Sequence, residues 1–121
     1  MNANKLIKKT IKNKKGKLFL FEKIFVNFNL KRFFIINSEK KLIRGEHGHK
    51  GTNQIFLPLN NEVEIEIYRK NFQKKFKLKL NEALLVPKKN WVRIKFKNYK
   101  SQLLIMSDKK FSKYDYFYEK N

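Results

Sequence analysis

Polar and apolar residues alternate along three stretches of the chain. In residues 62–68, 75–80 and 91–97, apolar side chains occupy every second position. A period of two is typical of a β-strand that buries one face and exposes the other. We therefore predict three strands. The Glu face of 62–68 is expected to be in water, where its carboxylates can pair with the lysines of 75–80 on a neighbouring strand.

Shorter apolar segments predict further strands, at residues 5–11, 18–22, 27–37, 54–59, 83–86 and 102–107. Polar segments between them predict turns, at residues 13–16, 38–42, 60–61 and 81–82. Asn tolerates positive φ, so Asn60 and Asn61 are expected to close a two-residue hairpin. Pro58 cannot donate a ladder hydrogen bond, which indicates an edge strand or a bulge.

No stripe of helical period runs along the chain, and the short segments recur at intervals of roughly 8–12 residues. This spacing predicts an all-β sandwich or barrel formed by a single domain over residues 1–121. Residues 111–121 form an aromatic tail, which is expected to pack on the body as a short helix or an irregular segment.

The composition favours a reducing compartment. The chain has no cysteine, so a disulfide framework is excluded. No apolar run approaches the ~20 residues of a membrane span. The first residues lead into no apolar segment typical of a secretory signal. We therefore expect a cytoplasmic protein with no membrane partner.

The net charge of +20 raises the question of nucleic acid as a partner. The excess consists of 26 Lys and only 4 Arg, spread along the whole chain. Arg is the residue that contacts phosphates and bases with fixed geometry. We therefore expect no nucleic-acid partner. A basic surface equally attracts a small anionic substrate such as a nucleotide sugar.

Both histidines of the chain lie two residues apart, at His47 and His49. In an extended segment, side chains at i and i+2 share one face and lie about 6.6 Å apart. A pair of surface histidines on a loop is the alternative. The flanking Arg44 and Gly45 and the strands around them favour a built site.

The His-x-His spacing within a predicted barrel suggests a cupin. A metal cupin continues with Glu after four intervening residues and a later third His. Here that Glu position holds Gln54, and residues 86–92 contain no histidine. Two imidazoles and a neutral amide make a poor divalent-metal site. We therefore predict no metal and no cofactor, with both imidazoles available as acid and base.

The segment Arg44-Gly45-Glu46-His47-Gly48-His49-Lys50, followed by Gln54, resembles the core of the nucleotide-sugar 3,4-ketoisomerases, which reads Arg-Gly-x-His-Ala-His-Lys. Supporting matches are residues 31–36, Leu59-Asn60, Val86-Pro87, Trp91 and Asp115-Tyr116. They run in order from about residue 5 to the C-terminus.

This resemblance implies a cupin-type jelly-roll β-barrel that dimerises by exchanging N-terminal strands, here residues 5–11. It implies a dTDP-4-keto-6-deoxyhexose as substrate and no metal. Such an enzyme moves the ketone from C4 to C3, in the biosynthesis of a dTDP-linked 3-amino-3,6-dideoxyhexose for surface glycans such as lipopolysaccharide O-antigen.

The residue types also suit this chemistry. A proton on C3 beside a C4 ketone is acidic, and neutral imidazoles can move it through an enediol(ate). Following the family's order, we assign His47 to carbon and His49 to the oxygens. The predicted substrate-binding residues are Arg32, Arg44, Gln54, Trp91 and Tyr116. Each also has a structural alternative: Arg44 can bond backbone carbonyls, Gln54 and Trp91 can belong to the core, Arg32 can be solvated, and Tyr116 can pack the tail.

Three departures from the family pattern stand out. Gly48 replaces Ala, which we expect to be sterically mild. Residues 33–35 replace a stretch that commonly carries Tyr, and Val92 replaces His. A non-catalytic nucleotide-sugar-binding cupin and a metal-dependent cupin enzyme therefore remain the alternatives.

Overall fold

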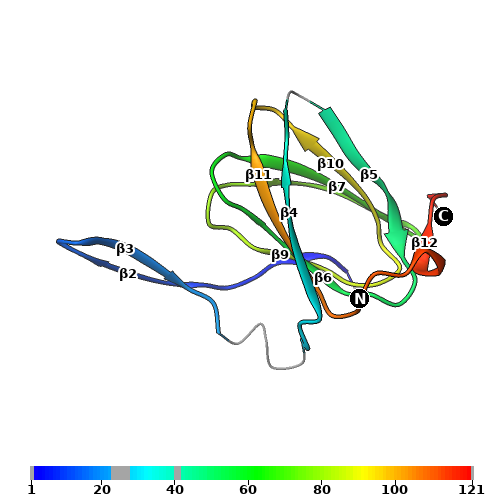
Figure 1. Cartoon of the computed structure of the whole chain (residues 1–121), viewed down its shortest axis with the longest axis horizontal. Helices are drawn as coiled ribbons and strands as arrows, with labels where there is room; N and C mark the ends of the chain where they lie inside the picture. The colour runs from blue at the N-terminus through cyan, green and yellow to red at the C-terminus, as the bar shows by residue number, and fades with distance from the viewer. Residues whose placement is uncertain (1, 23–27, 40–41, 121) are drawn as a thin grey trace.

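Two five-stranded antiparallel sheets form the body of the protein (Figure 1). The computed structural model describes residues 2–22, 28–39 and 42–120. In spatial order, the first sheet contains β1 (Asn4–Lys5), β9 (Leu84–Val86), β6 (Gln54–Pro58), β11 (Gln102–Ser107) and β4 (Arg32–Asn37). The second contains β12 (Tyr116–Phe117), β5 (Leu42–His49), β10 (Trp91–Phe96), β7 (Val63–Arg69) and β8 (Phe72–Leu78). The all-β prediction is confirmed.

A separate hairpin follows β1 in the chain. It pairs β2 (Lys9–Asn13) with β3 (Gly16–Leu20) and projects away from the body (Figure 1). Its turn lies where the sequence predicts one: the Lys15 N–H donates to Asn13 Oδ1 at 2.8 Å, and Gly16 has φ 133°. The single edge strand predicted for residues 5–11 is instead divided between β1 and β2.

The hydrophobic core lies between the two sheets, as the alternating pattern predicts. Its buried members come from β6, β7, β8, β9, β10 and β11, with Ala3 beside them: Phe56, Val63, Ile65, Ile67, Phe76, Leu78, Leu84, Val86, Val92, Ile94, Phe96, Leu103 and Ile105. Successive strand residues point to opposite faces, so every second residue of β7 and β10 enters this core.

The outer face of β7 differs from the prediction. Glu66 is only 3% exposed, so the expectation of a Glu face in water is wrong. Strand β7 lies between β10 and β8, and long cationic side chains from both neighbours cover the carboxylate. Arg93 Nη1 lies 3.1 Å and Lys95 Nζ 3.0 Å from Glu66, and Lys75 Nζ lies 3.6 Å away. Burial favours a raised pKa for Glu66, but the hydrogen bonds from Lys95 and Arg93 outweigh it and lower the pKa.

One turn prediction and one edge-strand prediction also need correction. Asn60 and Asn61 do not close a hairpin, because β6 and β7 belong to different sheets. The Asn60 side chain instead makes two hydrogen bonds at the start of β11. It donates to the Lys100 carbonyl at 2.9 Å and accepts from the Gln102 N–H at 2.8 Å. Pro58 does not mark an edge strand, since β6 lies inside its sheet. It ends β6, beyond the three residues that pair with β9.

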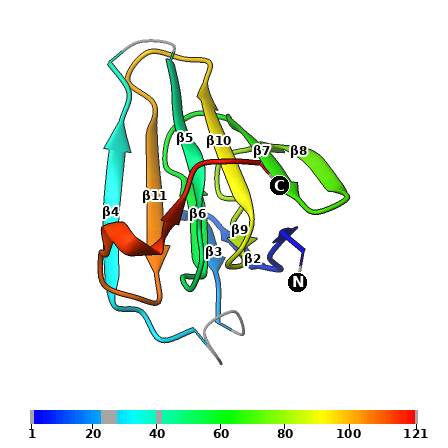
Figure 2. The same cartoon turned by 90° about the vertical axis from the view of Figure 1, so that its right-hand side faces the viewer.

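The tail packs on the body, as expected, but it does so partly as a strand. A 3-10 helix at Lys113–Asp115 leads into β12, which pairs with β5 at His49 and Gly48 (Figure 2). The predicted turn at 38–42 and the predicted strand segment 27–37 fall partly outside the described residues. Within the described part of the chain, no helix has the length and apolar character needed to cross a membrane.

Candidate functional site

A cavity of about 480 Å³ opens between β4 of the first sheet and β5 of the second. The walls contain both histidines and four of the five predicted substrate-binding residues: Arg32, Arg44, Gln54 and Tyr116. Apolar residues complete the lining, among them Phe34, Ile36, Val92 and Ile94. The structure therefore brings together charged, polar and apolar groups that are distant in the sequence.

A β-bulge in β5 aims the site residues. Val92 of β10 pairs with His47, and Arg93 pairs with Gly45, so that Glu46 is left as an extra residue. Gly45 and Glu46 adopt positive φ angles of 83° and 57°. Without the bulge, residues three apart in a strand would face opposite ways. The extra residue lets Arg44 and His47 both line the cavity.

The two imidazoles lie edge to face, with ring centroids 5.3 Å apart. His47 Nδ1 lies 3.0 Å from the Gly45 carbonyl oxygen, which can only accept, so Nδ1 carries the proton. His49 Nδ1 lies 2.8 Å from Asp115 Oδ2 and donates to that carboxylate. In each neutral ring the lone pair is therefore on Nε2, as a proton acceptor requires.

Asp115 contacts His49, although the sequence analysis gave it no role and named it only within the supporting match Asp115-Tyr116. It accepts from His49, from the Gly51 N–H at 2.6 Å and from the Thr52 hydroxyl. Burial favours a raised pKa for Asp115, but these hydrogen bonds outweigh it and hold the pKa below its usual value. Asp115 is therefore an anion at neutral pH. It fixes the orientation and the tautomer of His49.

Tyr116 covers both histidines from β12. Its ring stacks on His47 at 4.4 Å with an interplanar angle of 7°, and meets His49 edge to face at 4.6 Å. The Tyr116 ring therefore forms one wall of the cavity and limits the orientations of both imidazoles. This supports the predicted position of Tyr116 in the site.

The protonation of His49 gives a testable pH dependence. Burial is the largest influence and lowers the pKa of His49 from 6.5; His47 and Arg32 act in the same direction, against the opposing effect of Asp115. Because of this lowered pKa, His49 becomes mostly protonated only at a pH below 6.5. We expect kcat/KM to be level near pH 7 and to fall on acidification, with a midpoint below 6.5. Arg32→Gln should move that midpoint upward. A midpoint above 6.5 in the wild type would show that the lowered pKa of His49 does not set the pH dependence.

The remaining polar residues of the cavity differ in how many contacts they already make with other protein groups. Gln54 is buried and donates to the Ser107 hydroxyl at 3.0 Å, as a satisfied core amide would. Arg32 stacks over Phe34 at 4.5 Å and Phe111 at 5.2 Å. Arg44 makes no hydrogen bond or ion pair with any residue that the structure describes. Its guanidinium is therefore available to an anion that enters the cavity.

Trp91 is the predicted substrate-binding residue that the structure places elsewhere. It follows the outward alternation of β10 and is 3% exposed. Its Nε1–H donates to the Tyr118 carbonyl at 3.0 Å, on the far side of the sheet from the core. Direct contact between Trp91 and substrate has no support in this geometry.

The departures from the family pattern also have structural consequences. Val92 and Phe34 line the cavity, so the polar groups missing at these positions are missing from the site itself. We expected the replacement of Ala by Gly48 to be sterically mild, and this expectation is wrong. A Cβ there would clash with the Phe117 ring and lie 2.6 Å from the Asn90 carbonyl oxygen.

Among the described residues, no group of three or more His, Asp or Glu side chains comes together in a metal-binding arrangement. The absence of a metal from the functional protein remains a prediction, based on the residue types at the site.

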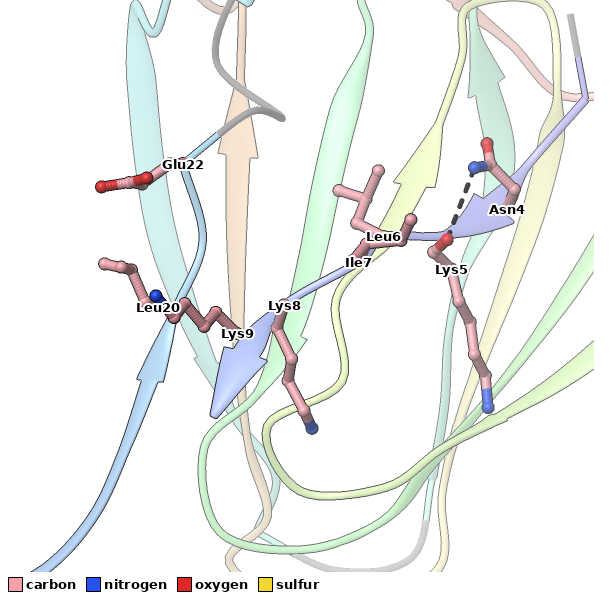
Figure 3. Close-up of a pocket in the computed structure, with 8 residues that line it drawn as sticks. All are labelled: Asn4, Lys5, Leu6, Ile7, Lys8, Lys9, Leu20 and Glu22. Atoms are coloured by element: carbon pink, nitrogen blue, oxygen red, sulfur yellow. Dashed lines mark hydrogen bonds between the residues drawn. The ribbon is translucent and has the colours of Figure 1, made fainter. Parts of the chain in front are cut away.

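A second cavity, of about 550 Å³, lies away from the histidines, beside the N-terminal hairpin. Figure 3 shows its lining: residues 4–9 on one side, with Leu20 and Glu22 across from them. Lysine stems and aliphatic side chains dominate this lining. The second cavity therefore offers no group with an obvious catalytic role.

Comparison with known families gives a match over almost the whole chain. The profile of the family described as FdtA, WxcM-like, C-terminal covers residues 2–121. The chain belongs to this family. A search of curated proteins found no match.

Solved structures give the same picture. WlaRA from Campylobacter jejuni, a TDP-fucose-3,4-ketoisomerase, is 29% identical, with a TM-score of 0.83 over 98% of this chain and 90% of its own. The 3,4-ketoisomerase QdtA from Thermoanaerobacterium thermosaccharolyticum, solved with TDP, is 26% identical, with a TM-score of 0.85 over 98% and 88%. A 3,4-ketoisomerase from Helicobacter canadensis, at 23% identity and a TM-score of 0.86 over 98% and 92%, shares the fold. The predicted resemblance to the 3,4-ketoisomerases and the predicted cupin fold are confirmed, and the relatives are enzymes.

Proposed function

We propose that this chain is a sugar 3,4-ketoisomerase whose substrate is a dTDP-4-keto-6-deoxyhexose. One observation carries the proposal. Two imidazoles face one cavity, each with Nδ1 hydrogen-bonded so that the lone pair of the neutral ring is on Nε2, and the half-buried Asp115 carboxylate holds one of them. A mutant of the relative QdtA was solved with TDP-4-keto-6-deoxyglucose, which supports this class of substrate.

The reaction requires two proton movements. A base takes the proton from C3, and the electrons of the C3–H bond form a C3=C4 double bond while O4 becomes an enolate oxygen and is protonated. O3 then loses its proton and forms the C3 ketone, while C4 accepts a proton. The net change moves one hydrogen from C3 to C4 and another from O3 to O4. Two imidazoles on one face can perform both movements.

The contacts of the histidines suggest a division of roles that differs from the sequence-based assignment. His49 donates to Asp115, whose charge stabilises the imidazolium that forms when His49 takes a proton. The partner of His47 Nδ1 is an uncharged backbone carbonyl, that of Gly45. We therefore assign the proton on carbon to His49 and the protons on the sugar oxygens to His47.

The nucleotide end of the substrate carries two phosphates. Of the two arginines that line the cavity, Arg32 stacks over Phe34 and Phe111, whereas Arg44 makes no hydrogen bond, ion pair or ring contact with any described residue. We expect Arg44→Ala to weaken TDP binding about 10–100-fold, as for the loss of charge-assisted hydrogen bonds. Arg69→Ala, outside the cavity, is the control. Binding measured by calorimetry should show a modest salt dependence, because few charges are neutralised. Equal affinities for Arg44→Ala and wild type would show that the phosphates bind elsewhere. Tight duplex DNA binding at physiological salt without TDP affinity would favour a nucleic-acid partner.

The proposed function is tested by incubating the protein with dTDP-4-keto-6-deoxyglucose and following the sugar by NMR. A 3-keto product supports the proposal. An unchanged sugar that nonetheless binds would identify a non-catalytic nucleotide-sugar-binding protein. In a pathway, the 3-keto product suits conversion to a 3-amino sugar, such as those of surface glycans, and the proposed location is the cytoplasm.

We further propose a dimer that exchanges its N-terminal segment. The N-terminal segment exposes apolar side chains that a monomer would leave in water: Ile7, between β1 and β2, is 91% exposed, and Leu18 and Ile11 of the hairpin are 55% and 39% exposed. All five residues of β2 are exposed, and the hairpin extends beyond the body (Figure 1). A second copy that covers these side chains would remove the unpaired edge.

Light scattering tests the dimer. We expect a wild-type dimer at micromolar concentration and a monomer for Ile7→Glu combined with Ile11→Glu, because the introduced charges cannot be buried without partners. The control is Tyr99→Glu, which changes an exposed aromatic residue between β10 and β11. A monomeric wild type, or a dimer unaffected by the two substitutions at residues 7 and 11, would contradict the exchange.

A further inference from the structure

The C-terminal strap, residues 112–120, supplies two of the groups that contact the histidines. Tyr116 stacks on His47, and Asp115 accepts from His49. Strand β12 of the strap pairs with β5 through two residues, and one further backbone hydrogen bond joins the Lys50 N–H to the Asp115 carbonyl at 2.7 Å. The arrangement of the site therefore depends on what holds the strap in register.

One anchor is a hollow in the surface of β5. Phe117 pairs with Gly48 across the two strands, and its ring edge occupies the space that a Cβ at residue 48 would need. The backbone of Asn90 closes the other side, since the same Cβ would lie 2.6 Å from its carbonyl oxygen. The hollow exists because residue 48 is Gly. It accepts the aromatic ring that follows Tyr116 directly.

A second anchor lies further along the strap. The Trp91 Nε1–H donates to the Tyr118 carbonyl at 3.0 Å. Lys120 Nζ lies 4.8 Å from the Trp91 ring and 4.4 Å from the Tyr68 ring, within cation–π range. Both contacts hold the strap on the outer face of β10. This gives Trp91 a function that does not require contact with the cavity.

We propose that Gly48, Phe117 and Trp91 are positioning residues that seat the strap and thereby place Tyr116 and Asp115 against the two histidines. The inference rests on the proposed function for its kinetic consequence, but its structural content does not. None of the three residues lines the cavity, so each acts through the strap. The seating is specific, because it combines an aromatic ring with a missing Cβ on the facing strand.

Phe117→Ala tests the first anchor and Trp91→Phe the second. Phe117→Ala empties the hollow, while Trp91→Phe keeps a large ring and removes the N–H donor. Tyr114→Ala is the matched control, since Tyr114 is an aromatic residue of the same strap that is 78% exposed. The readouts are kcat, the dissociation constant of TDP, and the proton NMR signals of the two imidazoles, which are simple to resolve because the chain has two histidines.

We expect both anchor variants to lower kcat, Phe117→Ala by about 10–100-fold, as for a small misplacement of reacting groups. TDP affinity should stay within about threefold, because the phosphates do not contact the strap anchors in the proposed site. The His47 ring signals should move downfield as the stacked Tyr116 ring leaves, and Tyr114→Ala should match wild type. Gly48→Ala should change the His47 signals in the same direction, since its Cβ displaces Phe117.

Unchanged His47 signals and unchanged kcat in both anchor variants would overturn the inference. If Phe117→Ala does not fold, Trp91→Phe decides by the same readouts. If the wild type has no isomerase activity, the proposed function fails. The NMR signals then still report whether the anchors seat the strap, so the two failures are distinguishable.

Discussion

His49→Asn should lower the kcat of isomerisation by about 10²–10⁴-fold and should slow hydrogen exchange at C3 to the same extent. An amide cannot take a proton from carbon. Asp115, positioned 2.8 Å from His49 Nδ1, would lose the imidazolium that its charge stabilises. The measurement is proton NMR of the nucleotide sugar in deuterated water, which follows exchange at C3 and product formation in one sample.

His47→Asn is the matched comparison, because it changes the other imidazole in the same way. We expect a large loss of isomerisation with some C3 exchange retained, since His47 moves the protons on oxygen and His49 remains intact. TDP should bind to both variants. The opposite pattern, with C3 exchange lost in His47→Asn and kept in His49→Asn, would restore the sequence-based assignment and contradict the role of Asp115.

Asp115→Asn should lower kcat by about 10²–10⁴-fold with TDP binding preserved. The carboxylate accepts three hydrogen bonds, from His49, Gly51 and Thr52. An amide has one acceptor oxygen, so its NH₂ group must face at least one of these donors. If that donor is His49, the imidazole changes tautomer and loses the lone pair on Nε2.

Asp108→Asn is the control for the loss of a carboxylate on a loop. Asp108 accepts from the backbone and the side chain of Asn53, both at 2.9 Å, and does not line the cavity. It should reduce stability with little effect on kcat in the folded protein. If Asp108→Asn and Asp115→Asn reduced kcat equally, Asp115 would be a structural residue of the tail and not a partner of the base.

The strands that bury one face were predictable from the sequence because their environment repeats every two residues. The alternation in β7 and β10 defines which of their side chains enter the core. The same pattern did not predict that Glu66 is buried. Its cover comes from Arg93 and Lys95 on a strand that is distant in the sequence. The sequence also did not predict that the Asn60 side chain hydrogen-bonds to Lys100 and Gln102, because these residues are 40 or more positions away.

The site was predictable as a set of residues but not as an arrangement. The His-x-His spacing placed His47 and His49 on one face, and the structure confirms their shared cavity. Simple alternation would turn Arg44 away from them. The bulge at Glu46 depends on pairing with β10, which a single sequence does not display. Asp115 reaches His49 only because the tail returns to pair with β5 as β12.

The most direct test of the central claim is deuterium incorporation by the wild-type protein. With a dTDP-4-keto-6-deoxyhexose in deuterated water, we predict loss of the C3 proton signal and appearance of a 3-keto sugar carrying deuterium at C4. Bound nucleotide sugar whose C3 proton persists unexchanged would contradict catalysis by the histidine pair.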